Sequence, residues 1–294
     1  MLIPHSSTCY MRKQSLFFFA FILPLLYCKA QSFNDKNFLS LSIGPSFPVG
    51  DYAKTNVNNN LAGFAKTGEQ VELSFEHKLS KHFGLAVMLH GQRNTINTTA
   101  MSEEFSQLKF YTAYFTGTTG YPTIPPPPVT SSYYTYPNWK FDAKSWLTGS
   151  LLIGAAGDFP IDTKTNKLFI TAKAMAGASY VSAPSMHGKS ITDSTLAEVS
   201  QNGATAFAFS YLISGGLKYK LTQKLRLLFN VNYFGTSQAK FKNVTETLAT
   251  AKGFTVPNVY TFPNAQSISS YSATGIERQS VSTIGLNVGI GLSL

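Results

Sequence analysis

The sequence predicts an all-β protein, a closed antiparallel up-and-down transmembrane barrel with eight strands. Three observations lead to this fold class. Apolar and other residues alternate one by one in eight segments, short and long links between these segments alternate, and helical periodicity is hard to find after Gln31. Alternation with a period of two is typical of strands that have one face in apolar surroundings. No later run reaches the eighteen or so apolar residues that a membrane helix needs.

The first thirty residues have the features of a secretory signal. Arg12 and Lys13 precede the apolar run SLFFFAFILPLLY, which is too short to span a bilayer, and the small residue Ala30 favours cleavage after it. We therefore expect residues 1–30 to be a signal peptide that directs export, with cleavage after Ala30. Residues 31–294 are then a single mature domain.

Composition of the mature chain argues for a large regular sheet. Cys9 and Cys28 are the only cysteines and both lie in the signal, so disulfides cannot hold the exported domain. The signal carries three basic residues and no acidic one, which leaves 21 basic and 14 acidic residues and a net charge of +7. This excess forms no Lys/Arg cluster along the sequence, so we expect no nucleic acid partner. Charged residues make up 13% and aromatic residues 14%, which is unusual for a soluble surface.

Eight segments show the alternation. In the second segment, for example, Val71, Leu73 and Phe75 lie on one face, and Glu72 and Glu76 lie on the other. The fourth and fifth segments are rich in small residues and alternate less cleanly. In chain order the segments are FLSLSIGPSF from Phe38, QVELSFEHKL from Gln70, FGLAVMLHGQ from Phe83, SWLTGSLLIGAAG from Ser145, LFITAKAMAGASY from Leu168, AFAFSYLISGGLKYKL from Ala206, LRLLFNVNYF from Leu225 and STIGLNVGIGLSL from Ser282.

The links between these segments alternate in length without exception. Short links are SKH, TQK and the roughly ten-residue DFPIDTKTNK. Four long loops are expected at about 48–66, 93–143, 181–204 and 236–277. In an up-and-down sheet this pattern puts every short turn at one end and every long loop at the other, which is the asymmetry of outer-membrane barrels. The stretch LKFYTAYF in the second long loop could continue the third strand, and this leaves ten strands as the alternative.

The short links also set the register. Because SKH has an odd number of residues, Leu79 faces Phe83 and Phe75 faces Val87 on one side of the sheet. A change of one residue in the link would turn one of the two apolar faces to the wrong side. The same register places Glu72, on the other side, directly opposite His90.

Alternation alone does not say whether the apolar face meets lipid or a protein core. A soluble barrel points its apolar residues inward, whereas a membrane barrel points them outward. Charged residues on the opposite faces, long loops confined to one end, and aromatic residues near strand ends all favour lipid. These aromatic residues are Phe83, Tyr211, Tyr219 and Tyr233. In hydrocarbon an open sheet edge is costly, so the eighth strand must pair with the first, and an eight-stranded interior is just filled by side chains.

The chain resembles a known family in three stretches. These are the leader ending in KAQ, the first strand LSLSIGPSFPVGDY running into an Asn-rich loop, and the alternating C-terminal strand. They are similar to the outer-membrane β-barrel domain family of Gram-negative bacteria, the OmpA/OmpX-like small barrels, which include porin-like members. The resemblance implies location in the outer membrane and says little about activity. The family often ends in an aromatic residue, whereas this chain ends in Leu294.

The candidate site is a polar network inside the barrel. We expect it to comprise the inward side chains of Glu72, Glu76, His90, Lys173, Lys218 and Arg226. A carboxylate that orients an imidazole is half of a catalytic arrangement. However, Glu72 and His90 face the lumen and no short motif supplies a nucleophile, so we interpret the pair as structural. If the network is continuous, it blocks conduction.

The function expected is a structural role or a surface-interaction role, by adhesion or ligand contact through the long loops. The partners are then outer-membrane lipid and a surface ligand or protein. The second long loop, rich in Tyr, Thr and Pro, has the chemistry of an adaptable binding surface. A narrow porin-like pore is the alternative, and an enzyme that modifies lipids or peptides is the second alternative. No cofactor, metal or catalytic residue is expected, because no phosphate loop and no metal-spaced His/Cys cluster occurs in the sequence.

Overall fold

The computed structural model describes residues 36–59, 61–107, 110–115, 129–134, 137–161, 167–191, 196–242, 244–250, 271–274 and 278–294. The expected signal peptide and its cleavage after Ala30 lie outside the described residues, as does the polyproline stretch at 125–128. Within the described ranges, no helix is both long and apolar enough to cross a membrane.

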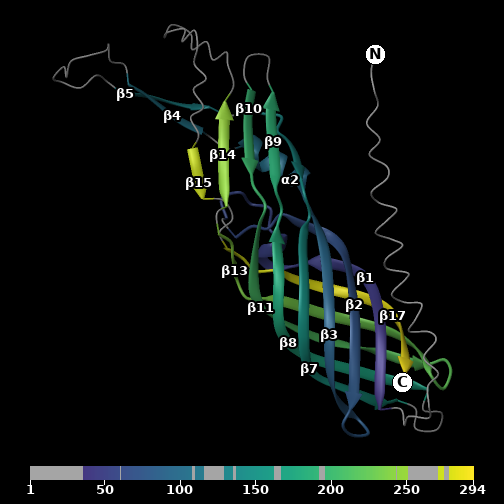
Figure 1. The fold of residues 1–294 in the computed structure, drawn as a ribbon. Helices are drawn as coiled ribbons and strands as arrows, with labels where there is room; N and C mark the ends of the chain where they lie inside the picture. Colours follow the sequence, from purple (N-terminus) through teal and green to yellow (C-terminus); the bar gives the residue numbers. More distant parts are fainter. Residues whose placement is uncertain are drawn as a thin grey trace, which may run out of the picture.

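Eight antiparallel strands form a closed barrel, as predicted, and the ten-strand alternative is wrong (Figure 1). Around the barrel the order is β1, β17, β12, β11, β8, β7, β3 and β2, so the last strand closes on the first. This seam pairs Leu41 with Ile290 and Ile43 with Val288. The strands are β1 (Asn37–Pro48), β2 (Ala65–Lys78), β3 (Phe83–Ile96), β7 (Trp146–Pro160), β8 (Leu168–Ala183), β11 (Ala204–Lys220), β12 (Leu225–Thr236) and β17 (Ser282–Ser293).

The pairing of β2 with β3 has the expected register. Phe75 pairs with Val87 and Glu72 pairs with His90, and the Leu79 N–H donates to the Phe83 carbonyl at 3.0 Å. Three short links join barrel strands at one end, which we call the turn end, and the long connections leave from the other, the loop end. The alternation of short and long links therefore corresponds to the two ends of one barrel.

The stretch LKFYTAYF does not continue the third strand. Helix α2 (Thr98–Gln107) follows β3, and β4 (Phe110–Phe115) then pairs with β5 (Val129–Tyr134) in a separate two-stranded sheet. The helix begins here because the Asn97 side chain accepts a hydrogen bond from the Ala100 N–H at 3.2 Å. An asparagine in this position satisfies a backbone donor that a helix start leaves unpaired. This cap ends the strand and redirects the chain.

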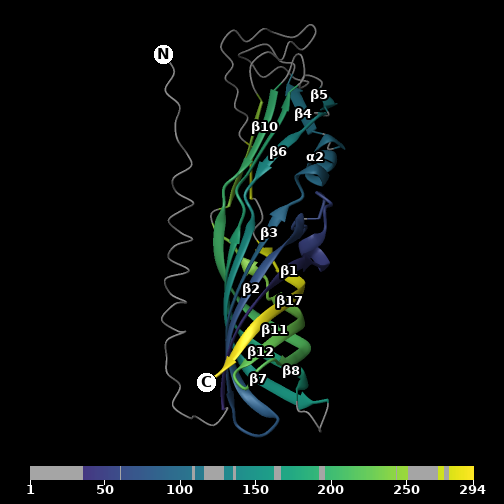
Figure 2. The same ribbon diagram turned by 90° about the vertical axis from the view of Figure 1, so that its right-hand side faces the viewer.

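A second sheet stands on the loop end of the barrel (Figures 1 and 2). Its strand order is β15 (Tyr271–Thr274), β14 (Thr245–Thr250), β10 (Leu196–Gln201), β9 (Met186–Ile191) and β6 (Lys140–Ala143). Three of these strands are joined to the neighbouring barrel strands by two residues each, β6 to β7, β8 to β9 and β10 to β11. The sheet repeats the order of the barrel wall beneath it, so it continues that wall beyond the barrel. We call this sheet, with α2, the external lobe.

Between the barrel and the lobe, two short structures narrow the loop end. A one-turn 3-10 helix, η2 (Gly50–Ala53), lies in the connection from β1 to β2. Strands β13 (Ala239–Lys240) and β16 (Arg278–Gln279) pair with each other beyond β12 and β17. The predicted long loops therefore contain regular structure at their bases.

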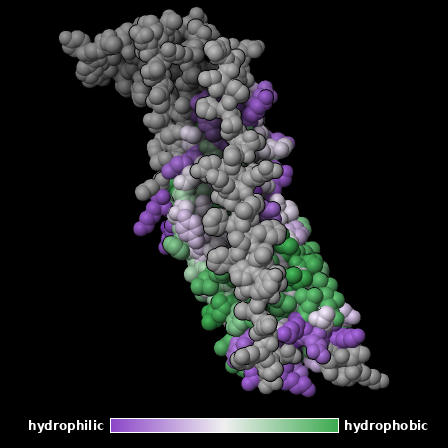
Figure 3. All heavy atoms as spheres, turned by 45° about the vertical axis from the view of Figure 1, so that its right-hand side comes forward, coloured by the Kyte–Doolittle hydropathy of each residue, from purple (hydrophilic) through white to green (hydrophobic). Residues whose placement is uncertain are grey.

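The outer wall of the barrel is covered by exposed apolar side chains. Figure 3 shows them as a green band around the lower part of the molecule, with hydrophilic residues beyond it at the turn end. The aromatic residues expected near strand ends, Phe83, Tyr211, Tyr219 and Tyr233, all lie outside. Other members include Leu41, Ile43, Leu73, Phe75, Leu85, Val87, Leu151, Ile153, Phe209, Ile213, Leu227, Phe229, Val288 and Ile290.

The inside of the barrel is polar on one side and apolar on the other. The predicted pattern of small and polar inward residues holds on the strands around the β1–β17 seam, with buried Ser40, Ser42 and Asn287. On the opposite wall, large apolar residues also point inward, namely Met88, Leu152, Met175 and Leu212. Because Leu151 faces out and Leu152 faces in, the fourth segment is apolar on both faces, which explains its poor alternation.

Glycines of β17 make room for the side chains that fill the seam. A Cβ atom on Gly291 would lie 2.2 Å from the Phe38 ring, and one on Gly285 would lie 1.7 Å from the Gln70 amide nitrogen. Both distances are much shorter than a van der Waals contact between heavy atoms, so a side chain at either position would force its neighbour to move. Glycine therefore occupies these inward positions of β17 because side chains from other strands fill the space beside them.

Replacing Gly291 tests this packing. Gly291→Val is expected to lower the free energy of unfolding by about 2 kcal/mol, because the rigid Phe38 ring must move. Gly215→Val is the matched control, since a Cβ atom there meets nothing within 4 Å. Denaturant unfolding in lipid vesicles measures both. Equal stability of the two variants would contradict the packing argument.

Candidate functional site

The lumen is filled near the turn end by an ion cluster. Lys218 Nζ lies 3.1 Å from Glu76 Oε2 and 2.9 Å from both carboxylate oxygens of Asp158. Lys173 Nζ lies 2.7 Å from Glu76 Oε1 and donates to the Ser74 hydroxyl at 3.3 Å. These side chains come from β2, β7, β8 and β11, so the ion pairs tie opposite walls of the barrel together. All are buried.

Asp158 is a member of this cluster that the sequence analysis missed. It lies in DFPIDTKTNK, which was interpreted as a link, whereas β7 extends to Pro160. Besides Lys218, it pairs with Lys78 Nζ at 3.6 Å. Its side chain lies inside because Asp158 has the same parity as the inward residues Ser150 and Leu152. A cavity of about 10 Å³ beside Asp158 has room for about one water molecule.

Arg226 lies apart from the ion cluster, closer to the turn end. Its guanidinium lies 5.4 Å from the centroid of the Phe38 ring, and Lys218 Nζ lies 4.1 Å from the same ring. Both cations are placed to interact favourably with the π-electrons of Phe38. The Phe38 ring is therefore a contact that Arg226 shares with Lys218 of the ion cluster.

Glu72 and His90 form a second polar group, farther toward the loop end. His90 Nδ1 lies 3.6 Å from Glu72 Oε1, and His90 Nε2 lies 3.3 Å from Gln92 Oε1. The Asn232 side chain also donates to Glu72. The His90 ring stacks on Phe234 with centroids 4.5 Å apart. The side-chain amides of Asn232 and Gln92 and the ring of Phe234 thus hold the pair in place.

Amide side chains complete this second group. Gln70 Nε2 donates to Asn287 Oδ1 at 2.9 Å and to Asn232 Oδ1 at 3.3 Å, across the lumen from β2 to β17 and β12. The Thr283 hydroxyl donates to Gln92 Oε1 at 3.1 Å. The six predicted lumen residues are therefore all inside and buried, but they form two groups and an isolated arginine rather than one network.

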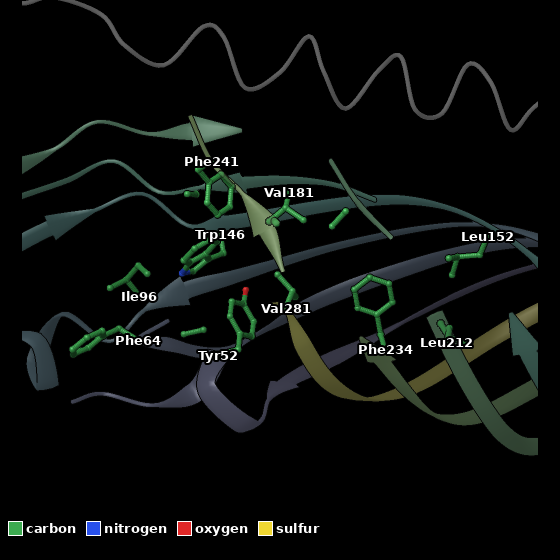
Figure 4. Packing of buried hydrophobic residues seen from close by; sticks show 14 of the residues in the cluster. Tyr52, Phe64, Ile96, Trp146, Leu152, Val181, Leu212, Phe234, Phe241 and Val281 are labelled. Atoms are coloured by element: carbon green, nitrogen blue, oxygen red, sulfur yellow. The ribbon is translucent and has the colours of Figure 1, made fainter. Parts of the chain in front are cut away.

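An apolar plug closes the barrel above these groups (Figure 4). The Tyr52 ring, carried by η2, meets the Trp146 ring edge-on with centroids 5.7 Å apart. Trp146 Nε1 donates to the Gly63 carbonyl at 2.9 Å. Phe241 and Phe234 lie to either side in the same cluster. The connection from β1 to β2 therefore folds back into the mouth of the barrel.

Tyr52 is anchored within the plug by hydrogen bonding. Its hydroxyl lies 3.4 Å from Asn94 Oδ1, and Asn94 Nδ2 donates to the carbonyls of Ser46 and Lys66 at 3.2 and 3.0 Å. Burial raises the pKa of the Tyr52 phenol well above its usual value, because the charged form would lose its hydration. Tyr52 therefore stays a neutral donor in the plug.

These layers determine what the lumen can do chemically. His90 and Glu72 lie between the ion cluster on one side and the plug on the other, so a lipid or peptide cannot approach them through the barrel. Within the described residues, no group of three or more His, Cys, Asp or Glu side chains could hold a metal ion. The geometry is that of a tightly packed interior.

The external lobe has an inner face with its own small cluster. Trp139, Ala197 and Val199 are buried there, and Phe141 of β6 packs against Phe105 of α2 with ring centroids 4.8 Å apart. The outer face carries charged residues, with Lys189 Nζ 3.0 Å from Glu198 Oε1. Helix α2 also joins the plug, since the Val57 N–H donates to Glu104 Oε2 at 3.1 Å. The lobe is thus packed onto the barrel.

The fold and this interior define a class of protein. The wall is apolar outside, the backbone is paired around the whole circumference, and charged side chains are enclosed. This is the arrangement that hydrocarbon requires of a sheet, because no edge may be left unpaired there. The chain is a transmembrane β-barrel of the outer-membrane type.

The chain matches no protein-family model and no curated protein sequence. Among solved structures it is similar to Neisserial surface protein A, with 9% identity and a TM-score of 0.35 over 89% of this chain and 98% of that one. It is also similar to Ail, the attachment invasion locus protein of Yersinia pestis, with 10% identity and a TM-score of 0.35 over 87% and 99%. The outer membrane protease OmpT from Escherichia coli has 8% identity and a TM-score of 0.41 over 90% and 99%. At such low sequence identity, these similarities apply to the fold alone.

Proposed function

We propose that the protein is a non-conducting anchor in the outer membrane of a Gram-negative bacterium that holds the external lobe outside the cell for contact with a surface ligand or protein. The observation that carries this proposal is the external lobe itself. Barrel strands continue into it in their own order, and it has its own buried cluster. A chain that needed only to fill the membrane would have no use for this structure.

The sealed lumen supports an anchor over the porin-like alternative. The ion cluster, the amides around Glu72 and the plug close the barrel at three successive levels. An open path for ions would require all three to part. The enclosed position of His90 likewise disfavours the second alternative, an enzyme that modifies lipids or peptides.

Conductance in planar lipid bilayers tests the sealed lumen. The refolded wild-type protein is expected to give no channel currents above those of protein-free bilayers. A refolded trimeric porin with an open channel serves as the positive control for insertion. Stable, voltage-independent currents from the wild-type chain would favour the pore and contradict the anchor.

Attachment of whole cells tests the role of the lobe. Cells that display the wild-type chain are expected to bind to surfaces coated with fibronectin, mucin or heparin more than cells that display a Phe141→Ala, Val199→Ser variant. Lys140→Ala and Lys144→Ala together give a matched control that spares the inner cluster. Surface labelling must show equal display of all three. Equal attachment on every coat would contradict a contact role for the lobe.

Packing of the lobe can be tested by itself. Phe141→Ala is expected to lower the local free energy of unfolding of the lobe by about 1 to 2 kcal/mol, because Phe141 is half-buried against Phe105 and Gly188. Lys140→Ala, its exposed neighbour on the opposite face, should change little. Limited proteolysis of the inserted protein measures the difference, and the barrel core should resist in both variants. Equal cleavage rates would contradict the packing of this face.

The same proposal includes export. Residues 1–30 are removed as a signal peptide, and Gln31 becomes the first residue of a single mature domain. Mass spectrometry of the protein extracted from the outer membrane tests this cleavage, and a retained leader would contradict it.

A further inference from the structure

The turn end of the barrel is strongly basic. Five exposed or half-buried lysines, which we call the lysine rim, lie at or just beyond strand ends there: Lys36, Lys81, Lys167, Lys220 and Lys224. Lys78 lies at the same end, but its amine faces inward, 3.6 Å from Asp158. The backbone brings these strand ends together in part, since the Lys78 N–H donates to the Lys36 carbonyl and the Lys220 N–H to the Lys167 carbonyl, both at 2.7 Å. Among the described residues, the acidic side chains at this end are Glu76 and Asp158. Both are buried and paired with lysines, so most of the rim charge is uncompensated.

Arg226 adds a buried charge just inside this rim. Its side chain is 95% enclosed, yet its Nε has no hydrogen-bond partner in the described part of the chain. The ion pairs found there do not include it, and its guanidinium is flanked by the rings of Phe38 and Phe169 at 5.4 and 5.8 Å. A buried cation without an anion is unfavourable. Arg226 therefore adds positive potential at the turn end, where the exposed rim lysines are free to attract an anion.

The position of the rim relative to the apolar band indicates where this anion comes from. Exposed Leu79 and Phe83 flank Lys81 in one turn, and exposed Leu221 precedes Lys224 in another. Lysines directly beyond an apolar band extend their amines to the level of the lipid headgroups. The lysines also follow the circumference rather than converge on one point. A ring of headgroups fits this arrangement better than a single free ion does.

We propose that the lysine rim binds the phosphates of anionic phospholipids in the leaflet at the turn end, which is the periplasmic leaflet. Each basic residue near an anionic membrane surface contributes favourably to binding. This inference goes beyond the proposed function, because it concerns the end of the barrel opposite the lobe and holds whether or not the lobe contacts a ligand.

Spin-labelled lipids provide the test. The wild-type protein in phosphatidylcholine bilayers is expected to associate with spin-labelled phosphatidylglycerol about threefold more than with spin-labelled phosphatidylcholine. A variant with Lys81→Gln, Lys167→Gln and Lys224→Gln should lose most of this preference. A matched variant with Lys54→Gln, Lys189→Gln and Lys240→Gln loses the same charge at the loop end and should keep it. Heat-modifiable mobility in SDS gels confirms that each variant is folded.

Three results would overturn the proposal. The wild-type protein could show equal association with the two lipids, or the loop-end variant could lose the preference as fully as the rim variant. Inorganic phosphate, added at constant ionic strength, could also abolish the preference. In that last case the rim would bind free phosphate rather than phospholipid.

Discussion

Lys218→Met is expected to lower the free energy of unfolding by about 3 kcal/mol. Lys218 is 1% exposed and is the only described side chain that joins Glu76 to Asp158. Methionine fills a similar volume but leaves the Asp158 carboxylate with the more distant Lys78 alone, at 3.6 Å. Removing one partner of a buried ion pair lowers stability by more than the intact pair contributes, because the remaining charge is then buried without a counter-charge and without water. Guanidinium unfolding in lipid vesicles, followed by tryptophan fluorescence, measures the change.

Lys189→Met is the matched control for this prediction. Its amine pairs with Glu198 at 3.0 Å, but the side chain is 48% exposed, so its removal should change stability by less than about 1 kcal/mol. Adding Asp158→Asn to Lys218→Met should recover part of the loss, because the second change removes the uncompensated carboxylate. Equal destabilisation by Lys218→Met and Lys189→Met would contradict the prediction, because it would mean that burial does not determine how much each ion pair contributes to stability.

The sequence predicts the barrel well because its strands obey one simple rule. Each strand has two faces, and a one-residue error would expose charge to lipid, so parity and link length together determine the register. This is why the placement of Glu72 opposite His90 follows from the three residues of SKH. The inward position of Lys173, Lys218 and Arg226 follows from the same parity.

The distribution of those residues into separate groups could not be read from parity. Which inward side chains meet depends on strand tilt and on the stagger around the barrel, and both are global properties. Phe38, for example, contacts both Lys218 and Arg226 although the three residues occupy different strands. Asp158 was missed because Pro160 in the same stretch favours a turn, whereas the strand runs to that proline.

The external lobe was missed for another reason. Its strands are short, and LAEVSQ alternates over only a few residues, with Ala197 and Val199 on the inner face and Glu198 on the outer face. Helix α2 has a start signal in Asn97, but its ten residues are too few and too polar for a clear helical period. Alternation of apolar and polar residues indicates whether a strand face meets lipid or water. It indicates tertiary packing only weakly.

Trp146→Ala is expected to lower the free energy of unfolding by about 3 to 5 kcal/mol. Trp146 is fully buried at the centre of the plug, and it contacts Tyr52 and Phe241 with ring centroids 5.7 and 6.2 Å away. Truncation leaves a large cavity and removes the donor to the Gly63 carbonyl. Guanidinium unfolding in vesicles, followed here by far-UV circular dichroism because Trp146 is one of the two tryptophans of the chain, measures the loss. Trp146→Phe, which keeps a ring but no N–H donor, should cost only about 1 to 2 kcal/mol.

Conductance measurements on variants can show whether the plug or the ion cluster seals the barrel. Trp146→Ala opens the barrel only at its loop end, and the ion pairs of Lys218 with Glu76 and Asp158 remain across the lumen below it. The variant should therefore stay closed in planar bilayers despite its loss of stability. Channel currents from Trp146→Ala would mean that the plug alone seals the barrel and that ions pass between the side chains of the cluster. Currents that appear only when Lys218→Met is added would instead make the ion cluster the barrier below the plug, and they would show that the amides around Glu72 do not seal the lumen by themselves.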